Sequence, residues 1–313
     1  GAGIALETGS TACLARLALH DMDCASSEIL FGSEFSGGAL FLNGSWAIIS
    51  DVLVSGNRAN HGAGVATWGV ESSRIEDSVF EHNEGTQWGG TVLAEEQTVT
   101  EFHRVQFSHG SSPYGGHIDD GAVASPLFKD CVFEFGYASS HGSTYYSYAA
   151  SSPRFENVVI QHGHAQGSAA VYINQGTLPQ FNNVTFFNNS AAVEAAAVRA
   201  NVDGSRGVLV FSRSRFIRNS APHKGAVSAR SNVMFVDCDF EDNTATATNG
   251  GAVELFSSMG AGHPTSFLRV KFLRNQAVAG GALSTNWDGG ETPEVVITEC
   301  TFEGNKATGS GGA

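Results

Sequence analysis

The chain has 313 residues, a formal net charge of -14 at pH 7 and a sequence pI near 5.1. This acidic balance argues against binding to nucleic acid phosphates or anionic membranes, and the lack of an 18-residue apolar run excludes a membrane-spanning helix. Glycine is abundant, at 38 residues, but it has no collagen period, and an apolar fraction of 42% argues against disorder.

Residues 1–36 depart from the pattern that fills the rest of the chain, and we expect them to form an irregular N-terminal coil. A loop or short helix is expected around residues 14–19, before the regular array begins. Cys13 and Cys24 both lie in this segment. We predict a local disulfide between them, a pairing that secretion would favour.

Residues 37–313 form a repeat array in which one large apolar residue anchors each unit, at spacings of 24 to 32 residues. Another large apolar residue stands five positions before each anchor, and a small residue stands two before it. Along the chain, exposed residues alternate with these apolar and small residues, and this period of two indicates a short strand. The anchors are Val54, Phe80, Phe107, Phe133, Ile160, Phe186, Phe216, Phe240, Phe272 and Phe302.

Two further features recur with the anchors. Asn or Gly follows three positions after each anchor, as in Asn57, Gly110 and Asn243. Because these residue types share a tolerance of positive φ, we expect a left-handed turn residue here. The second feature is a run of small residues before Val or Leu, as in 251–253, which predicts another strand with a tightly packed entry. In the irregular middle units we assign the position of this small-residue run and its strand to residues 121–123 and to Tyr146.

Columns of like residues with several short strands per unit and no helical period predict an all-β fold, a single-stranded parallel β-helix of about ten to eleven coils. A propeller blade needs about 40 residues, which exceeds the observed spacing. At about 4.8 Å per coil the rod would be roughly 50 Å long. Residues 1–4 resemble residues 62–65, and residues 311–313 begin another small-residue run. We therefore expect the array to continue beyond both ends, or to stack on another copy.

The middle of the array is rich in tyrosine beside acidic residues, within residues 114–120 and 137–148. Aromatic rings beside carboxylates can stack on sugar rings and bind their hydroxyls. These residues are our candidate ligand or partner patch, although a structural packing role is an equal alternative. The tyrosines of the patch are Tyr114, Tyr137, Tyr145, Tyr146 and Tyr148.

A ladder of charged or amide residues lies three positions before the anchors, including Asp77, Arg104 and Asp130. Polysaccharide lyases and hydrolases built on β-helices place carboxylates and arginine on such a face. The alternating signs favour another interpretation, namely ion pairs between adjacent coils. His82 and His109 should stack beside this ladder, but Phe135 interrupts their column, so we expect no metal site.

Three Asn-x-Ser/Thr sequences make Asn43, Asn183 and Asn188 candidate glycosylation sites. Cys131, Cys238 and Cys300 occupy one inward column at least two coils apart, which is too far for a disulfide. We therefore interpret these three as buried small residues.

The paired motifs Phe-x-x-Asn and Gly-Gly-Ala-Val/Leu, literal in residues 240–243 and 250–253, resemble the repeats of polymorphic outer membrane proteins. The resemblance covers nearly the whole chain. It implies a right-handed parallel β-helix on a cell surface and a role in adhesion, and its motifs imply a fold more than an activity.

From these observations we expect an extracellular or cell-surface structural or adhesive protein without enzymatic activity or cofactor. It could be a subunit of a surface fibre that assembles with other copies or related β-helix chains. The alternative is a carbohydrate-binding or carbohydrate-active β-helix, either a lyase or a hydrolase. Glycans are possible partners, whereas nucleic acid and direct membrane insertion are not expected.

Overall fold

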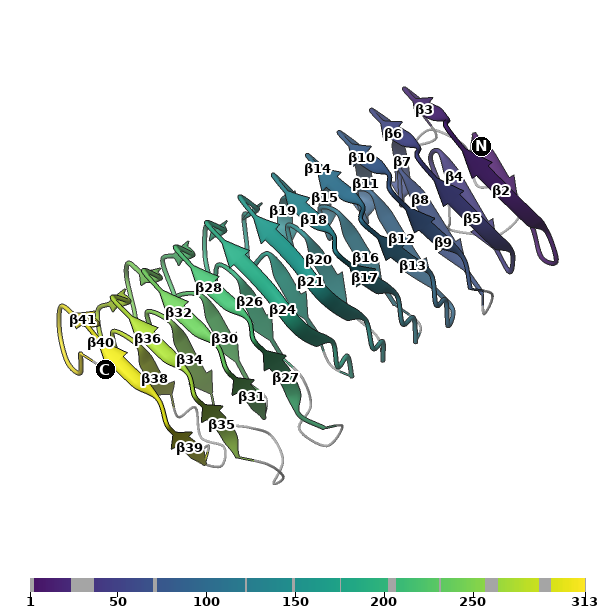
Figure 1. Ribbon diagram of the computed structural model, residues 1–313. Coiled ribbons are helices and arrows are strands. Elements are labelled where there is room, and N and C mark those ends of the chain that lie inside the picture. The colour runs from purple at the N-terminus through teal and green to yellow at the C-terminus, as the bar shows by residue number, and fades with distance from the viewer. Residues whose placement is uncertain are drawn as a thin grey trace.

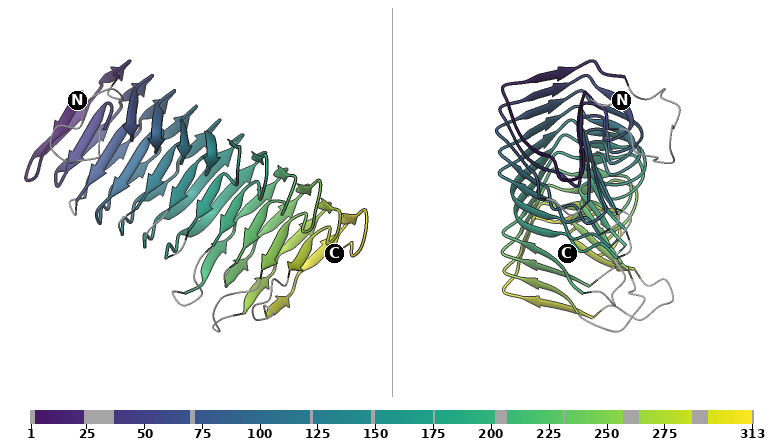
Figure 2. Two further views of the ribbon diagram at one scale, coloured as in Figure 1. Left: turned by 180° about the vertical axis from the view of Figure 1, so that it is seen from behind. Right: turned by 90° about the vertical axis from the view of Figure 1, so that its right-hand side faces the viewer.

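The computed structural model describes residues 3–23, 37–69, 72–121, 123–147, 150–174, 176–201, 207–230, 232–256, 264–286 and 294–312. No residue in these ranges is helical. The chain winds into coils that stack along one axis, so segments one repeat apart lie side by side (Figure 1). In a view turned by 90°, successive coils overlie one another (Figure 2, right). The predicted parallel β-helix is confirmed.

The described strands form three parallel sheets, here called sheets A, B and C. Each complete coil contributes in chain order to sheet A, then through one bent segment to sheet B, and then to sheet C.

Sheet A comprises 11 described strands. They are β1 (Ile4–Leu6), β4 (Leu40–Asn43), β8 (Val65–Trp68), β12 (Val92–Glu95), β16 (Ile118–Asp120), β20 (Tyr145–Ser147), β23 (Val171–Ile173), β26 (Val198–Ala200), β30 (Val227–Ala229), β34 (Val253–Phe256) and β38 (Leu283–Asn286).

Sheet B comprises 20 described strands, because most coils enter it twice, before and after a bend. They are β2 (Thr11–Ala15), β3 (Ala18–His20), β5 (Trp46–Ser50), β6 (Leu53–Ser55), β9 (Arg74–Glu76), β10 (Val79–Glu81), β13 (Glu101–His103), β14 (Gln106–Ser108), β17 (Leu127–Lys129), β18 (Val132–Glu134), β21 (Arg154–Gln161), β24 (Gln180–Phe187), β27 (Leu209–Ser212), β28 (Arg215–Ile217), β31 (Val233–Val236), β32 (Asp239–Glu241), β35 (Thr265–Leu268), β36 (Lys271–Leu273), β39 (Val295–Thr298) and β40 (Thr301–Glu303).

Sheet C comprises 10 described strands. They are β7 (Arg58–His61), β11 (Glu84–Trp88), β15 (Ser111–Tyr114), β19 (Tyr137–His141), β22 (His164–Ala165), β25 (Ser190–Ala191), β29 (Ser220–Ala221), β33 (Thr244–Ala245), β37 (Gln276–Ala277) and β41 (Lys306–Ala307).

Two columns of large apolar side chains fill the interior behind sheet B. The register pairs Phe80 with Phe107, and Phe102 with Phe128, as the repeat spacing predicts. The rings of Phe102 and Phe128 stack with centroids 5.0 Å apart, and those of Phe216 and Phe240 stack at 4.5 Å. All of these rings are buried. Since a coil cannot cover its own inner face, each ring is excluded from water by the coils on either side.

A column of buried asparagines runs beside the phenylalanines. The side-chain amide of Asn243 donates to Phe216 O at 2.8 Å and to Asn275 Oδ1 at 2.9 Å, and its own Oδ1 accepts from the backbone and side chain of Asn219 at 3.0 Å. The expected positive φ is instead found one residue earlier, as at Asp242 with φ 56°. The prediction of a left-handed residue at the Asn column was therefore wrong, because Asn is required there for hydrogen bonding.

Three middle coils have Gly110, Gly136 and Gly163 in place of this asparagine. The buried imidazole of His117 lies against the first two: a Cβ built on Gly110 would come within 2.5 Å of His117 Nδ1. His117 Nε2 lies 3.1 Å from the carbonyl oxygen of Glu134. Burial lowers the pKa of His117 to about 3, so the ring is neutral. Glycine is thus used here to make room for a ring from another part of the coil.

The regular pairing begins earlier than residue 37. Strand β1 pairs with β4, β2 with β5, and β3 with β6, all in parallel register. Residues 14–19 therefore belong to sheet B and the bend within it, and not to a loop or helix preceding the array. Cys13 is exposed in β2, but Cys24 lies outside the described residues, so the disulfide stays a prediction.

The two middle assignments for the small-residue run were also wrong. Ile118, not Val123, pairs with Val92 in sheet A, and Val123 is 53% exposed. In the next coil Tyr145, not Tyr146, pairs with Ile118 and points into the core. With two adjacent tyrosines, the sequence alone does not decide which one faces inward.

Candidate functional site

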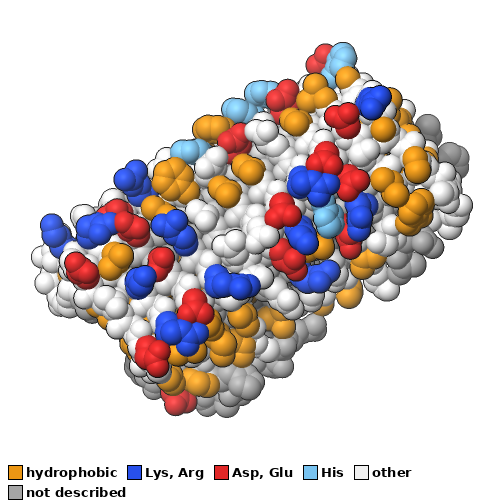
Figure 3. Space-filling model, viewed as in Figure 1, with side chains coloured by type: hydrophobic (Ala, Val, Ile, Leu, Met, Phe, Trp, Pro, Cys, Tyr) orange, Lys and Arg blue, Asp and Glu red, His pale blue; other side chains and the backbone are white. Residues whose placement is uncertain are grey.

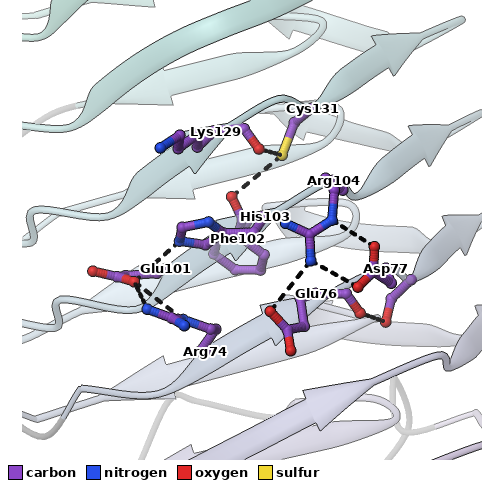
Figure 4. Close-up of polar contacts among 10 residues, drawn as sticks. Arg74, Glu76, Asp77, Glu101, Phe102, His103, Arg104, Lys129 and Cys131 are labelled. Atoms are coloured by element: carbon purple, nitrogen blue, oxygen red, sulfur yellow. Dashed lines mark hydrogen bonds and ion pairs between the residues drawn. The ribbon is translucent and has the colours of Figure 1, made fainter.

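The charged ladder lies at the bend within sheet B, where each residue has a positive φ, such as 49° at Asp77 and 53° at Arg104. The Arg104 guanidinium donates to both carboxylate oxygens of Asp77, at 2.6 and 2.7 Å, and more weakly to Glu76 (Figure 4). The hydrogen bond from Arg104 lowers the pKa of Asp77. This carboxylate is therefore tied to the next coil.

The ladder continues along the rod. Arg269 donates to both oxygens of Asp237, at 2.6 and 3.0 Å, and the Asn157 amide donates to Asp130 at 2.9 Å. Red and blue side chains accordingly lie next to each other across this face (Figure 3). The predicted pairing between coils is confirmed at Asp77–Arg104 and Asp237–Arg269.

The histidine column stands at the corner between sheets B and C. His82 and His109 stack at 4.5 Å, His109 and Phe135 at 5.0 Å, and Phe135 and His162 at 5.1 Å. The Asn188 side chain contacts His162 Nδ1 at 3.0 Å. Among the described residues no group of three or more His, Cys, Asp or Glu side chains is arranged to hold a metal ion.

The predicted tyrosine patch separates into three places. Tyr145 is fully buried and packs edge-on against Phe155. Tyr114 and Tyr146 point outward at the edge between sheets C and A, while Tyr137 points outward from sheet C. Tyr148 lies outside the described residues. The structure thus brings two of the predicted tyrosines together and separates the others.

Tyr114 and Tyr146 belong to a larger aromatic cluster on the outer face. Their centroids are 5.0 Å apart and tilted by 52°, and Tyr146 stacks on Tyr172 at 5.3 Å. His141 stacks on the same Tyr172 at 4.7 Å, and the Arg199 guanidinium lies 5.5 Å from the Tyr172 ring centroid. The four aromatic residues of this cluster are each half-buried. Tyr172 and Arg199 were missed because they lie in the next two coils, beyond the tyrosine-rich stretches that defined the predicted patch.

Two adjacent carboxyl groups in β16 are completely buried. Asp120 points inward and accepts a hydrogen bond from Ser151 at 3.0 Å. Asp119 lies on the opposite face of the strand, and neither of its oxygens has a hydrogen-bond partner among the described residues. Burial, with the neighbouring charges of Asp120 and Glu95, raises the pKa of Asp119 well above its ordinary value. Burial also raises the pKa of Asp120 to about 7.

The glycosylation candidates differ in access. Asn183 and Asn188 are exposed at the two corners of one coil, whereas Asn43 is half-buried and donates to Glu7 at 3.1 Å. Glycosylation of these three residues stays a prediction.

Of the three cysteines of the inward column, Cys131 and Cys238 are buried as predicted, whereas Cys300 is half-buried. Cys131 Sγ donates to the carbonyl oxygens of Phe102 and Lys129 at 3.4 and 3.3 Å (Figure 4). Burial raises the pKa values of Cys131 and Cys238 to about 12, so both thiols remain protonated and unreactive. Their place is taken by Ser78 in another coil, where the hydroxyl makes the equivalent contact with the Glu76 carbonyl.

A shallow hollow lies on the outer surface of sheet C. It has a volume of about 290 Å³ and is lined by β7, β11, β15 and β19, including Tyr137. A second hollow of about 490 Å³ lies near the bend of sheet B, beside Gln180 and Arg213.

Comparison with known proteins identifies one repeat by sequence. Residues 299–313 match the Chlamydia polymorphic membrane protein repeat. The chain carries a polymorphic membrane protein repeat. In the structure this segment contains β40, β41 and the turn between them, and its Phe302 pairs with Phe272 in the ladder that runs along the rod.

The polymorphic membrane protein repeat, together with the fold, indicates a surface-associated β-helix protein. No curated protein and no solved structure matches the chain. No helix in the described part is long and apolar enough to cross a membrane.

Proposed function

We propose that this chain is an adhesive segment of an extracellular surface protein, in which the β-helix is a rigid support and its outer faces make the contacts. The observation that carries the proposal is the polymorphic membrane protein repeat stacked in register along the rod. Paired ladders fix each coil on the next, so residues from several coils keep a constant spacing.

The distribution of surface groups supports adhesion over catalysis. Asp77 and Asp237, two acidic groups of the exposed ladder, each accept two hydrogen bonds from an arginine of the next coil. A general acid or base has to exchange protons with substrate, and such pairing opposes this. By contrast, the aromatic residues at the surface of the middle coils remain partly exposed, as at Tyr137 with 41%.

Beads coated with the 313-residue protein would test the adhesive role. We expect them to attach to cell layers more strongly than beads coated with heat-unfolded protein, and attachment should persist in the presence of a metal chelator. Equal attachment by folded and unfolded protein would overturn the proposal.

Two finer expectations belong to the same proposal. Association with further copies or related β-helix chains, as in a fibre, would give concentration-dependent sedimentation of the native protein. Glycans on Asn183 and Asn188 would be released by an endoglycosidase and detected as a mass shift. The exposure of both side chains favours modification.

A further inference from the structure

The hollow on sheet C exists because one small residue interrupts a column of larger ones. The register aligns Arg58, Glu84, Ser111, Tyr137 and His164 across successive coils. Ser111 therefore lies between the charged side chains of β7 and β11 and the ring of β19. A serine side chain cannot fill the space that its neighbours span, and a depression of about 290 Å³ remains.

One wall of the hollow is aromatic. The Tyr137 ring is 41% exposed, and its neighbour on the far side is His164, with ring centroids 6.2 Å apart and planes at 19°. On the near side its aligned neighbour is Ser111, which is too small to cover a ring. One face of Tyr137 is thus supported by a stacked imidazole while the other borders the hollow.

The remaining walls are polar and can both donate and accept hydrogen bonds. Arg58 Nε lies 3.4 Å from Glu84 Oε1, and both side chains are about half exposed, at 45% and 53%. The Thr86 hydroxyl donates to Asn60 at 2.9 Å, so its oxygen can still accept another hydrogen bond. Ser111 and Ser139 add two more hydroxyl groups to the lining.

An aromatic face opposite a cation, a carboxylate and several hydroxyls matches the chemistry of a sugar ring, which has an apolar C–H face and a rim of hydroxyls. The volume is at the small end for ligand sites, which suits a single ring. Glu84 and the net charge of -14 disfavour an anionic ligand.

We propose that the hollow lined by Arg58, Glu84, Thr86, Ser111, Tyr137 and Ser139 binds one neutral pyranose unit of a glycan. The proposal deepens the adhesive function and rests on it, because it supplies the chemical class of the surface that the rod would recognise. The Tyr137 ring packs on the C–H face of the sugar, and Arg58 and Glu84 bind adjacent hydroxyls.

Saturation-transfer NMR on the full chain with the methyl glycosides of glucose, galactose, mannose and N-acetylglucosamine tests the site. We expect transfer to at least one glycoside, and a loss of affinity of tenfold or more in Tyr137→Ala. Ser111→Tyr would fill the hollow while leaving Arg58, Glu84 and Tyr137 in place, and it should also abolish transfer. Its matched control is Ser220→Tyr, at the same position of sheet C in a distant coil, which should bind as the unaltered protein does.

Circular dichroism is used to verify that each variant is folded before its saturation transfer is compared with that of the unaltered protein. Absence of transfer to any of these glycosides, or unchanged transfer in both Tyr137→Ala and Ser111→Tyr, would overturn the sugar site.

Bead attachment separates this proposal from the adhesive one. If beads carrying Ser111→Tyr attach as well as the unaltered protein, the rod is adhesive but the sugar site does not mediate adhesion. If the glycoside binds but no beads attach, the site stands and the adhesive function fails.

Discussion

Single buried polar residues determine how each coil sits on the next. Asn243 satisfies the Phe216 carbonyl, the Asn275 side chain and two donors of Asn219 at once. An apolar residue of similar size would leave the Phe216 carbonyl and the two Asn219 donors without this partner, and Asn275 Oδ1 would keep only its bond from the backbone N–H of residue 243. The cost of an unpaired buried polar group is what makes asparagine necessary at this position.

Replacement of Asn243 by Ala should therefore lower the free energy of unfolding by at least about 2 kcal/mol, because several buried groups lose a partner. Urea denaturation followed by far-UV circular dichroism measures this change. Asn286→Ala is the control, since Asn286 is exposed and makes one long contact, 3.5 Å, with Glu254. Similar losses in both variants would contradict the role of the buried ladder.

The buried carboxyl groups make stability depend on pH in the opposite direction to the ion pairs. The pKa of Asp119 is raised above its ordinary value of 3.8, and that of Asp120 is raised to about 7, both chiefly by burial. Folding therefore favours the protonated forms. Their contribution is fully present below pH 3.8 and is lost as the pH rises, for Asp120 through about 7.

Asp119→Asn should stabilise the protein at pH 8 by about 1–3 kcal/mol, since a neutral amide replaces a buried carboxylate without partners. At pH 5 the gain should be smaller, because the native carboxyl is then protonated. Thermal unfolding at both pH values measures the difference. Asp51→Asn, on the exposed ladder, is the control. A variant that is less stable than the unaltered protein at pH 8 would show that Asp119 has an essential partner.

At the scale of elements, the bend of sheet B holds the charge ladder in a fixed geometry. The bend residues have a positive φ, and at Asp77 and Asp237 the side chain reaches the equivalent residue of the next coil. These pairs are exposed, and salt screens them. They contribute more to the alignment of coils than to stability.

Asp77→Arg should lower the melting temperature slightly at low salt, because it places two guanidinium groups side by side. Combining it with Arg104→Asp should restore the pair. The difference between single and double variants should shrink at high salt, as measured by thermal denaturation. Under the alternative of a carbohydrate-active enzyme, Asp77→Asn and Asp130→Asn would instead abolish turnover of a polysaccharide substrate while leaving the fold intact.

The repeat columns could be predicted because they follow from covalent spacing and burial alone. Phe80, Phe107 and Phe133 align as expected because a large apolar side chain fills the interior at that position. The asparagine column was located but misinterpreted, since a tolerance of positive φ and a need for four hydrogen bonds select the same residue. The exchange of asparagine for glycine beside His117 depends on contacts between different parts of the coil, which spacing does not encode.

The candidate site was predictable only in part, for a related reason. The sequence identified Tyr137 as part of a patch but grouped it with Tyr145, which points into the core, and with Tyr146, which points outward from sheet A. The partners that make a hollow around Tyr137 come from three preceding coils, and Arg58 is 79 residues away along the chain. Its most informative member is the small Ser111, which carries no motif.

At the scale of the molecule, each coil contacts mainly its two neighbours, so stability is a sum of local terms. A lost ring in one coil should weaken that coil and those beside it, and the effect should fade along the rod. The two columns of large apolar side chains, most of them phenylalanine, are the main apolar link between coils.

Phe216→Ala should destabilise the protein by about 3–5 kcal/mol, because it opens a cavity in the stack. Hydrogen exchange followed by mass spectrometry should show faster exchange in β24, β28 and β32 and little change in β5 and β9. Met234→Ala, which alters an exposed side chain of β31, is the control. Uniformly faster exchange along the whole chain would contradict a local response.

The parallel stacking also has a mechanical consequence. The described strands lie across the rod axis, so tension along the axis loads the hydrogen bonds between neighbouring coils, and the coils should separate one at a time at modest force. The hollow on sheet C spans four coils, from β7 to β19. A ligand bound there would contact all four coils and link them to one another. The rod would therefore resist mechanical unfolding most strongly at the site that binds the ligand.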